Sequence, residues 1–183
     1  LIMERRNAPG AIVKGINLEG KVGIPNIFEI QLGYTFQSSR SVEAFEWAEN
    51  STLEPQRRMF RTPDQYGYFT STFNITRDFR ASLFGTYTGP MLVQHTKYTG
   101  EDPGGEAIYE DLEKTTQSFF DAGFKLSYNF RLSSTIGLEL SAGIKNIFNS
   151  YQNDLDYGAM KDAGYVYGPA TPRLYFVGLG FKM

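Results

Sequence analysis

Apolar and polar residues alternate along most of this chain, and the alternation is its strongest pattern. Between Phe120 and Phe130 the even positions are Phe, Ala, Leu or Tyr, whereas the odd positions are Asp, Gly, Lys, Ser and Asn. A period of two places each set of side chains on its own face of a β-strand. The same pattern is clear in 27–36, 136–144 and 174–183, and weaker in 12–22, 66–75 and 79–91. The sequence therefore predicts an all-β fold with seven strands.

Short and long connections between these strands alternate strictly. The first, third and fifth strands are followed by short turns, whereas the other three links are polar and run to about 20 residues, far beyond ordinary hairpin loops. The long links cover residues 41–63, 94–115 and 149–172. Strands of about ten residues with short turns at one end and long loops at the other are typical of an antiparallel transmembrane β-barrel. A soluble β-sandwich, whose strands also alternate, is the other interpretation.

The barrel interpretation also makes a prediction about completeness. Single-chain bacterial barrels have an even number of strands, with long loops outside the cell and short turns in the periplasm. Seven is odd, and the first strand would begin on the extracellular side while Met183 ends in the periplasm. Open sheet edges are not tolerated in lipid. We therefore expect residues 1–183 to be the C-terminal segment of a larger barrel.

Composition and charge narrow the choice of function. The 183 residues include 15 Phe, 12 Tyr and 19 Gly, which favours β-structure. The net charge of -2 argues against nucleic-acid binding. The chain has no Cys and one His, His95, so thiolate chemistry and any site with two imidazoles are excluded. No apolar run approaches the ~18 residues of a transmembrane helix. No catalytic motif is recognisable, so we do not expect an enzyme.

Several motifs resemble those of TonB-dependent outer-membrane receptors. Lys145-Asn-Ile-Phe-Asn149 followed by Tyr151 is similar to a strand-end motif of that family, and Pro172-Arg-Leu-Tyr175 is similar to the start of its final strand. Three further matches are Ala11-Ile-Val-Lys-Gly15, Arg61-Thr-Pro63 and Tyr87-Thr-Gly-Pro90. The chain departs from the family pattern in having Asn17 where Glu is common, one residue between Asn149 and Tyr151, and Met183 in place of a terminal Phe.

The resemblance covers nearly the whole chain and implies the last seven strands of a barrel of about 22 strands around a plug. It implies ligand-gated, TonB-driven import across the outer membrane of a Gram-negative bacterium. Iron–siderophore complexes are the first expected substrate, followed by haem or cobalamin. The implied partners are TonB, acting through a plug outside this chain, the rest of the barrel, lipid and lipopolysaccharide. Likeness to Bacteroidetes sequences adds a surface lipoprotein.

Three alternatives to a metal-chelate transporter stay open. The chain could belong to a TonB-dependent glycan importer, or to a small autonomous outer-membrane barrel with a structural or adhesive role. It could also be a soluble β-sandwich that binds a ligand. A barrel would need detergent and resist heat before denaturing on a gel, whereas a soluble module would need neither.

The long loops are where substrate contacts would lie. Aromatic side chains beside arginines could stack on or pair with an aromatic or anionic ligand. The candidate binding residues are Trp47, Arg57 and Arg58 in the first loop, Tyr98 in the second, and Tyr151 and Tyr157 in the third. Packing within the loops and at the membrane interface is the alternative role for these side chains.

Acidic residues suggest two further kinds of chemistry. The second loop could hold Ca²⁺ through carboxylate oxygens, and its acidic residues are Glu101, Asp102, Glu106, Glu110 and Asp111. In the third loop, Asp154 and Asp156 could serve as ligands or as an acid–base pair. Ordinary solvated loop structure is the alternative for both groups. On the predicted polar face we expect a charge network of Glu29, Asp121, Lys125 and Glu139.

Overall fold

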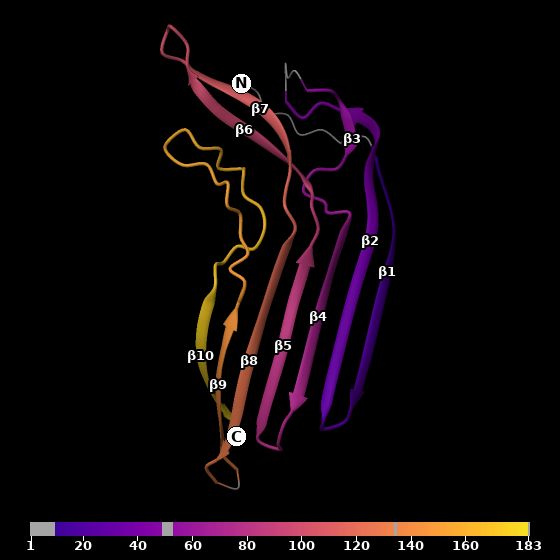
Figure 1. The fold of residues 1–183 in the computed structure, drawn as a ribbon, viewed down its shortest axis with the longest axis vertical. Coiled ribbons are helices and arrows are strands. Elements are labelled where there is room, and N and C mark those ends of the chain that lie inside the picture. Colours follow the sequence, from indigo (N-terminus) through magenta and orange to yellow (C-terminus); the bar gives the residue numbers. More distant parts are fainter. Residues whose placement is uncertain (1–9, 49–52, 134, 183) are drawn as a thin grey trace.

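A computed structural model describes residues 10–48, 53–133 and 135–182 of the chain. Its strands are β1 (Ala11–Ile24), β2 (Phe28–Phe45), β3 (Gln56–Arg58), β4 (Gln65–Asn74), β5 (Phe79–Thr88), β6 (Leu92–Glu101), β7 (Ala107–Thr115), β8 (Phe119–Arg131), β9 (Gly137–Lys145) and β10 (Leu174–Lys182). The main sheet is antiparallel and has the order β1-β2-β4-β5-β8-β9-β10, with β3 paired to β2 (Figure 1). The all-β class and the seven long strands predicted from the alternation are therefore present. Within the described residues, no helix has the length and apolar character needed to cross a membrane.

The strand register places the apolar faces predicted for 12–22, 27–36, 120–130, 136–144 and 174–183 on one side of the sheet, together with the odd positions of β4 and β5. Directly opposed residues of neighbouring strands lie on the same face. One continuous row runs through Val22, Ile30, Ser71, Leu83, Phe124, Ile144 and Tyr175. Ser71 is the one polar member of this row, and its hydroxyl donates to the carbonyl oxygen of Leu83 at 3.3 Å. We call this side of the sheet the apolar face and the opposite side the polar face.

The apolar face is exposed rather than buried. Leu18 is 60% exposed, Leu83 46% and Val177 75%, although all three are aliphatic and central in their strands. The polar face is instead held together by short polar contacts between strands, such as Thr72 Oγ1 to Ser82 Oγ at 3.3 Å. The described buried hydrophobic side chains are Leu92, Val93, Phe119, Ala122 and Tyr165. The sheet therefore has no apolar core of its own on either face.

Three of the four residues predicted to form a charge network on the polar face, Glu29, Lys125 and Glu139, take part in two ion pairs. Lys125 Nζ lies 3.5 Å from Glu139 Oε1, between β8 and β9. Lys21 Nζ lies 3.0 Å from Glu29 Oε1, between β1 and β2. The pairing follows the register, because Lys21 is opposite Gln31 and thus two residues from Glu29 on the same face. Each of these two contacts links a pair of neighbouring strands.

Short and long connections separate to opposite ends of the sheet, as the alternation of link lengths predicts. Figure 1 shows the turns after β1, β4 and β8 at one end, where β10 also finishes, and the long connections at the other. The turns are built locally. Asn26 has a φ of 63°, and the Thr76 hydroxyl accepts a hydrogen bond from the Phe79 backbone N–H at 3.0 Å. We call these two ends the turn end and the loop end.

The long connections contain more regular structure than the sequence predicts. Residues 94–115, expected as a loop, lie almost entirely in a separate two-stranded hairpin, β6–β7, which projects beyond the sheet (Figure 1). Its tip is a turn in which Asp102 Oδ1 accepts hydrogen bonds from the N–H groups of Gly104 and Glu106, each at 2.8 Å. In the first connection, β2 continues to Phe45 and pairs with β3.

Both long edges of the main sheet are open within the described residues. β1 pairs only with β2 and β10 only with β9, and these two strands lie at opposite ends of the strand order. The described strands therefore form an open antiparallel sheet rather than a closed barrel.

Candidate functional site

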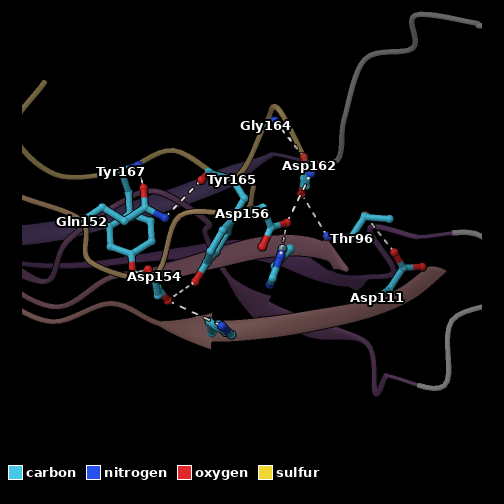
Figure 2. A network of polar contacts seen from close by, with 11 residues as sticks. Thr96, Asp111, Gln152, Asp154, Asp156, Asp162, Gly164, Tyr165 and Tyr167 are labelled. Atoms are coloured by element: carbon cyan, nitrogen blue, oxygen red, sulfur yellow. Dashed lines mark hydrogen bonds and ion pairs between the residues drawn. The ribbon is translucent and has the colours of Figure 1, made fainter. Parts of the chain in front are cut away.

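The second and third long connections meet at the loop end in one group of polar and aromatic side chains. This group, the loop-end cluster, consists of His95, Lys114, Asp154, Asp156, Asp162, Tyr165 and Tyr167, and most of it is shown in Figure 2. His95 lies on β6 and Lys114 on β7, whereas the other five belong to the segment 146–173 between β9 and β10. The cluster therefore packs the third long connection against the hairpin.

His95 and Tyr165 form the buried centre of the cluster. Their exposed fractions are 2% and 1%, and their rings stack with centroids 3.8 Å apart and an interplanar angle of 14°. His95 Nε2 lies 2.8 Å from Asp156 Oδ2. This hydrogen bond lowers the pKa of Asp156 from its usual value, against a smaller opposing effect of burial. No described atom pairs with the buried Nδ1 of His95.

Asp154 accepts hydrogen bonds from two tyrosines at once. The Tyr165 hydroxyl donates to Oδ2 at 2.6 Å and the Tyr167 hydroxyl donates to Oδ1. Lys114 Nζ lies 3.5 Å from Oδ2 and 5.1 Å from the centre of the Tyr165 ring.

These contacts set the protonation states of the three groups. Partial burial raises the pKa of Asp154, but the hydrogen bonds from the tyrosines and the charge of Lys114 outweigh it and lower the pKa to about 2. Burial and the bond to Asp154 raise the pKa of Tyr167 to about 12 and raise that of Tyr165 further. At neutral pH the carboxylate is thus ionised and both phenols are protonated. Such charge-assisted hydrogen bonds hold a loop in place, and a carboxylate with so low a pKa is poorly suited to act as a base.

Asp162 and Arg61 connect the cluster to the neighbouring segments. Asp162 Oδ2 accepts a hydrogen bond from the Thr96 N–H of β6 at 2.9 Å, and its own N–H donates to Asp156 Oδ2 at 3.2 Å. Arg61 comes from the first connection and has a φ of 55°. Its guanidinium donates to the carbonyl oxygens of Val166, at 2.8 Å, and Gly164. All three long connections are therefore joined at this end of the sheet.

Asn146 anchors both ends of the segment 146–173. Its side chain is fully buried, with an exposed fraction of 0%. Nδ2 donates to the carbonyl oxygens of Ser150 at 3.0 Å and Thr171 at 2.9 Å, while Oδ1 accepts from the Ser150 N–H at 2.8 Å. The φ of Asn146 is 48° and that of Asn149 is 53°. Asn tolerates this left-handed conformation better than most residues, which explains two of the residue types in the strand-end motif.

The first-loop candidates, Trp47, Arg57 and Arg58, face different neighbours. Trp47 Nε1 donates to Glu113 Oε1 of β7 at 3.2 Å. Arg58 pairs with Asp64 at 2.9 Å. Arg57 is exposed and lines a groove on β1 and β2. Trp47 therefore helps to hold the first connection against the hairpin, whereas the two arginines lie elsewhere.

The other three candidates also lie apart. Tyr98 on β6 meets Tyr109 of β7 edge to face, with centroids 5.9 Å apart. Tyr151 is 43% exposed and lines a hollow of about 280 Å³ within the third connection, together with Tyr167. Tyr157 is 86% exposed. The six candidates do not share one pocket, and their role in binding stays a prediction.

The contacts of His95 with the third connection and of Lys114 with Asp154 were not predicted from the sequence. A signal was present in the spacing Asp154-x-Asp156 and Tyr165-x-Tyr167, since residues two apart in extended chain lie on one side. The partner strand was not predicted, so the contact could not be assigned. For the calcium hypothesis, no group of three or more His, Cys, Asp or Glu within the described part of the chain is arranged to hold a metal ion.

Comparison with known proteins finds no matching family model, no match among curated proteins and no match among solved structures. The functional conclusion therefore depends on the geometry and on the motif resemblance.

Proposed function

We propose that this chain forms part of the β-barrel of a TonB-driven outer-membrane transporter that imports an iron–siderophore complex or another metal chelate, such as haem or cobalamin. The observation that supports this most strongly is the apolar face, which runs across all seven strands of the main sheet and is exposed. A soluble sandwich would bury such a face against a second sheet. The other described sheet, the two-stranded hairpin β6–β7, projects beyond the end of the main sheet, whereas lipid would cover the apolar face in a membrane.

Aromatic rings are arranged in two rows on the apolar face, as in the interface girdles of membrane barrels. Near the turn end, Phe28 lies 6.3 Å from Phe73 and Phe79 lies 6.4 Å from Tyr128, measured between ring centroids. Near the loop end, Tyr34 lies 6.1 Å from Tyr87, and Phe69 lies 6.2 Å from Phe120. Aliphatic residues between the two rows include Ile30, Leu83, Leu126, Ala142 and Val177.

The open edges favour a barrel larger than the described sheet. β1 and β10 each have one side without a strand partner among the described residues. Unpaired backbone groups cost several kcal/mol each in hydrocarbon, on the order of the desolvation of an amide. Further strands at both edges would satisfy them, which fits a C-terminal barrel segment better than a small autonomous barrel.

Transport itself is proposed from the resemblance to TonB-dependent receptors. The resembling motifs lie where the strands meet the long connections. Asn146 and Asn149 anchor the third connection, Arg61 binds its backbone, and the Gly89 N–H donates to the Gln65 carbonyl oxygen at 2.8 Å. These motifs thus have a physical role in shaping the loop end, where substrate would enter. The TonB complex would act through a plug contributed by other residues of the protein.

Uptake by the source bacterium tests this function. Deleting the gene should abolish growth on a metal chelate as the sole source of iron or cobalt-containing cofactor, and deleting TonB should have the same effect. A panel of siderophores, haem, cobalamin and oligosaccharides would separate a chelate transporter from a glycan importer. Normal uptake of every panel member in the deletion strain would overturn the proposal.

Membrane placement needs its own control. The protein should fractionate with the outer membrane, require detergent for extraction and migrate faster on a gel before heating than after it. Recovery in a soluble fraction without detergent would favour the β-sandwich alternative.

A further inference from the structure

Three cations line one groove at the loop end of β1 and β2. The groove has a volume of about 490 Å³, and its lining includes Lys14, Arg40, Arg57 and Ser38. Lys14 is directly opposite Ser38 in the register of β1 and β2, so both lie on the apolar face. Arg40 lies on the same face, opposite Ile12. The pairing of β1 and β2 therefore brings Lys14 and Arg40 together at one corner of the mainly apolar face, and Arg57 of β3 lines the same groove.

No described carboxylate neutralises these cations. None lines the groove, and none lies within ion-pair distance of Lys14, Arg40 or Arg57 among the described residues. Other cations of the sheet have such partners, as Lys21 does in Glu29 and Arg58 in Asp64. Like charges that share a site repel one another, and an anion between them removes this repulsion. The groove is therefore suited to an anionic group.

The height of the groove places this anion at a membrane surface. Ile24, at the turn end of β1, is ten positions after Lys14, which corresponds to a rise of about 33 Å along the strand. At the usual barrel tilt this becomes roughly 25 Å along the membrane normal, the height of the apolar band of an outer-membrane barrel. Lys14 and Arg40 would thus lie at the headgroups on the loop side, just beyond the lipid-covered band.

The groove also offers apolar surface to the same ligand. Ile12 and Val42 line it and are 50% and 47% exposed, and Ile16, one step below Lys14 on the same face, is 65% exposed. A ligand with an anionic head and an apolar chain would contact both kinds of surface. Inorganic phosphate would use only the cations.

We propose that Lys14, Arg40 and Arg57 bind the phosphate of a phosphorylated lipid in the leaflet beside the long connections. Guanidinium groups pair with phosphate oxygens through two parallel N–H donors, Lys adds a point charge, and the Ser38 hydroxyl is a further donor. The inference rests on the proposed membrane location, because only there does a lipid headgroup meet this corner of the sheet.

Native mass spectrometry of the intact protein that carries this chain tests the site. The probes are a bisphosphorylated glycolipid of the lipid A type and its dephosphorylated form, each added to the protein in detergent. The test variant combines Lys14→Gln, Arg40→Gln and Arg57→Gln. The matched control combines Arg77→Gln, Lys97→Gln and Lys161→Gln, which removes the same charge from three exposed positions outside the groove.

The phosphorylated lipid should bind the test variant at least about tenfold more weakly than the unchanged protein, since each basic residue near a membrane surface contributes about a fivefold factor. The control variant should bind within about twofold of the unchanged protein, and the dephosphorylated lipid should bind all three proteins equally. Equal affinity of the phosphorylated lipid for all three proteins would overturn the proposal. Displacement of the lipid by millimolar inorganic phosphate would also overturn it, by showing a free-phosphate site.

Heat-dependent gel mobility, measured on the same samples, shows whether each variant is folded. A protein with normal mobility, detergent-dependent extraction and no selective lipid binding would refute the lipid site alone. A protein that is soluble without detergent would refute the membrane location, and the lipid site with it.

Discussion

The main sheet and the loop-end cluster use apolar and polar side chains in opposite ways. In the sheet, aliphatic side chains such as Leu83 and Val177 are exposed, while small polar residues such as Ser127, with 5% exposure, are buried between strands. At the loop end, His95, Asn146 and Tyr165 are almost fully buried and find most of their partners within the protein.

The difference reflects the surroundings that each region needs. In the proposed membrane location, lipid would cover the apolar face of the sheet and remove it from water. We expect the loop end to be stable in water, because it has its own small core and pairs most of its buried polar groups internally. Three sets of substitutions and one change of pH test whether the sheet and the loop end are stabilised differently. They are given from the largest expected loss of stability to the smallest.

Removing the buried ring of Tyr165 from the loop-end cluster should cause the largest loss of stability. Tyr165→Ala deletes a side chain that is 1% exposed, so we expect a loss of about 3–5 kcal/mol in the local stability of the cluster. Hydrogen exchange should then rise in residues 92–101 and 150–172 and stay unchanged in β4 and β5. Tyr157→Ala, at a position that is 86% exposed, is the control. Unchanged exchange in Tyr165→Ala would show that the cluster does not hold these segments together.

A charge on the apolar face should destabilise the sheet only in the membrane. Leu83→Arg places a guanidinium in the middle of the proposed lipid-covered band, at an expected cost of about 2–4 kcal/mol. Ser82→Arg, on the polar face of the same strand, is the matched control. Unfolding by denaturant in lipid bilayers measures the difference. Equal destabilisation by both variants would contradict the assignment of the two faces.

Substitutions of Asn146 separate backbone conformation from hydrogen bonding. Asn146→Ala loses three side-chain hydrogen bonds and must adopt a φ of 48° unfavourable for Ala, so we expect a loss of about 2–3 kcal/mol. Asn146→Gly keeps the conformation accessible and loses only the hydrogen bonds, so it should lose less. Limited proteolysis of the segment 146–173 compares the two. If both variants are cleaved as slowly as the unchanged protein, Asn146 is not an anchor.

Protonation of Asp154 in acid should lower the stability of the loop end. This is the smallest of the four expected effects. The pKa of Asp154 is lowered from 3.8 to about 2 in the folded protein. The stabilisation is therefore fully present above pH about 4 and is lost as the pH falls from about 4 towards 2. Because Asp154 is 37% exposed, solvent screening limits the effect to about 1 kcal/mol.

Hydrogen exchange of the third connection as a function of pH measures this loss. In Asp154→Asn, the third connection should exchange its amide hydrogens faster at neutral pH. The variant should show no further loss of stability between pH 4 and pH 2. Lys161→Gln, an exposed substitution in the same connection, should retain the pH dependence of the unchanged protein. If Asp154→Asn shows the same acid-dependent loss of stability as the unchanged protein, another carboxyl group is responsible for that loss.

The sequence motifs could be recognised without the structure, but the contacts of their residues could not be predicted. The strand-end motif was recognised by resemblance, yet the roles of Asn146 and Asn149 follow only from their backbone conformation and partners. Trp47 and Tyr157 are candidates because they are aromatic residues in long links that could contact a ligand. One of them is held by Glu113, and the other projects into solvent. Residue type alone could not distinguish these two environments, because each depends on a neighbour distant in the sequence.

The sequence by itself determined the seven long strands, their two faces and the alternation of short and long connections. These features depend on residues two apart or on turns of a few residues, so their physical cause is local. Only the tertiary structure decided that residues 94–115 form a hairpin and that His95 meets Asp156, 61 positions away in the chain. It also decided that Lys14, Arg40 and Arg57 share one groove. Such contacts arise from the pairing of strands and the packing of connections, which no local period of the sequence encodes.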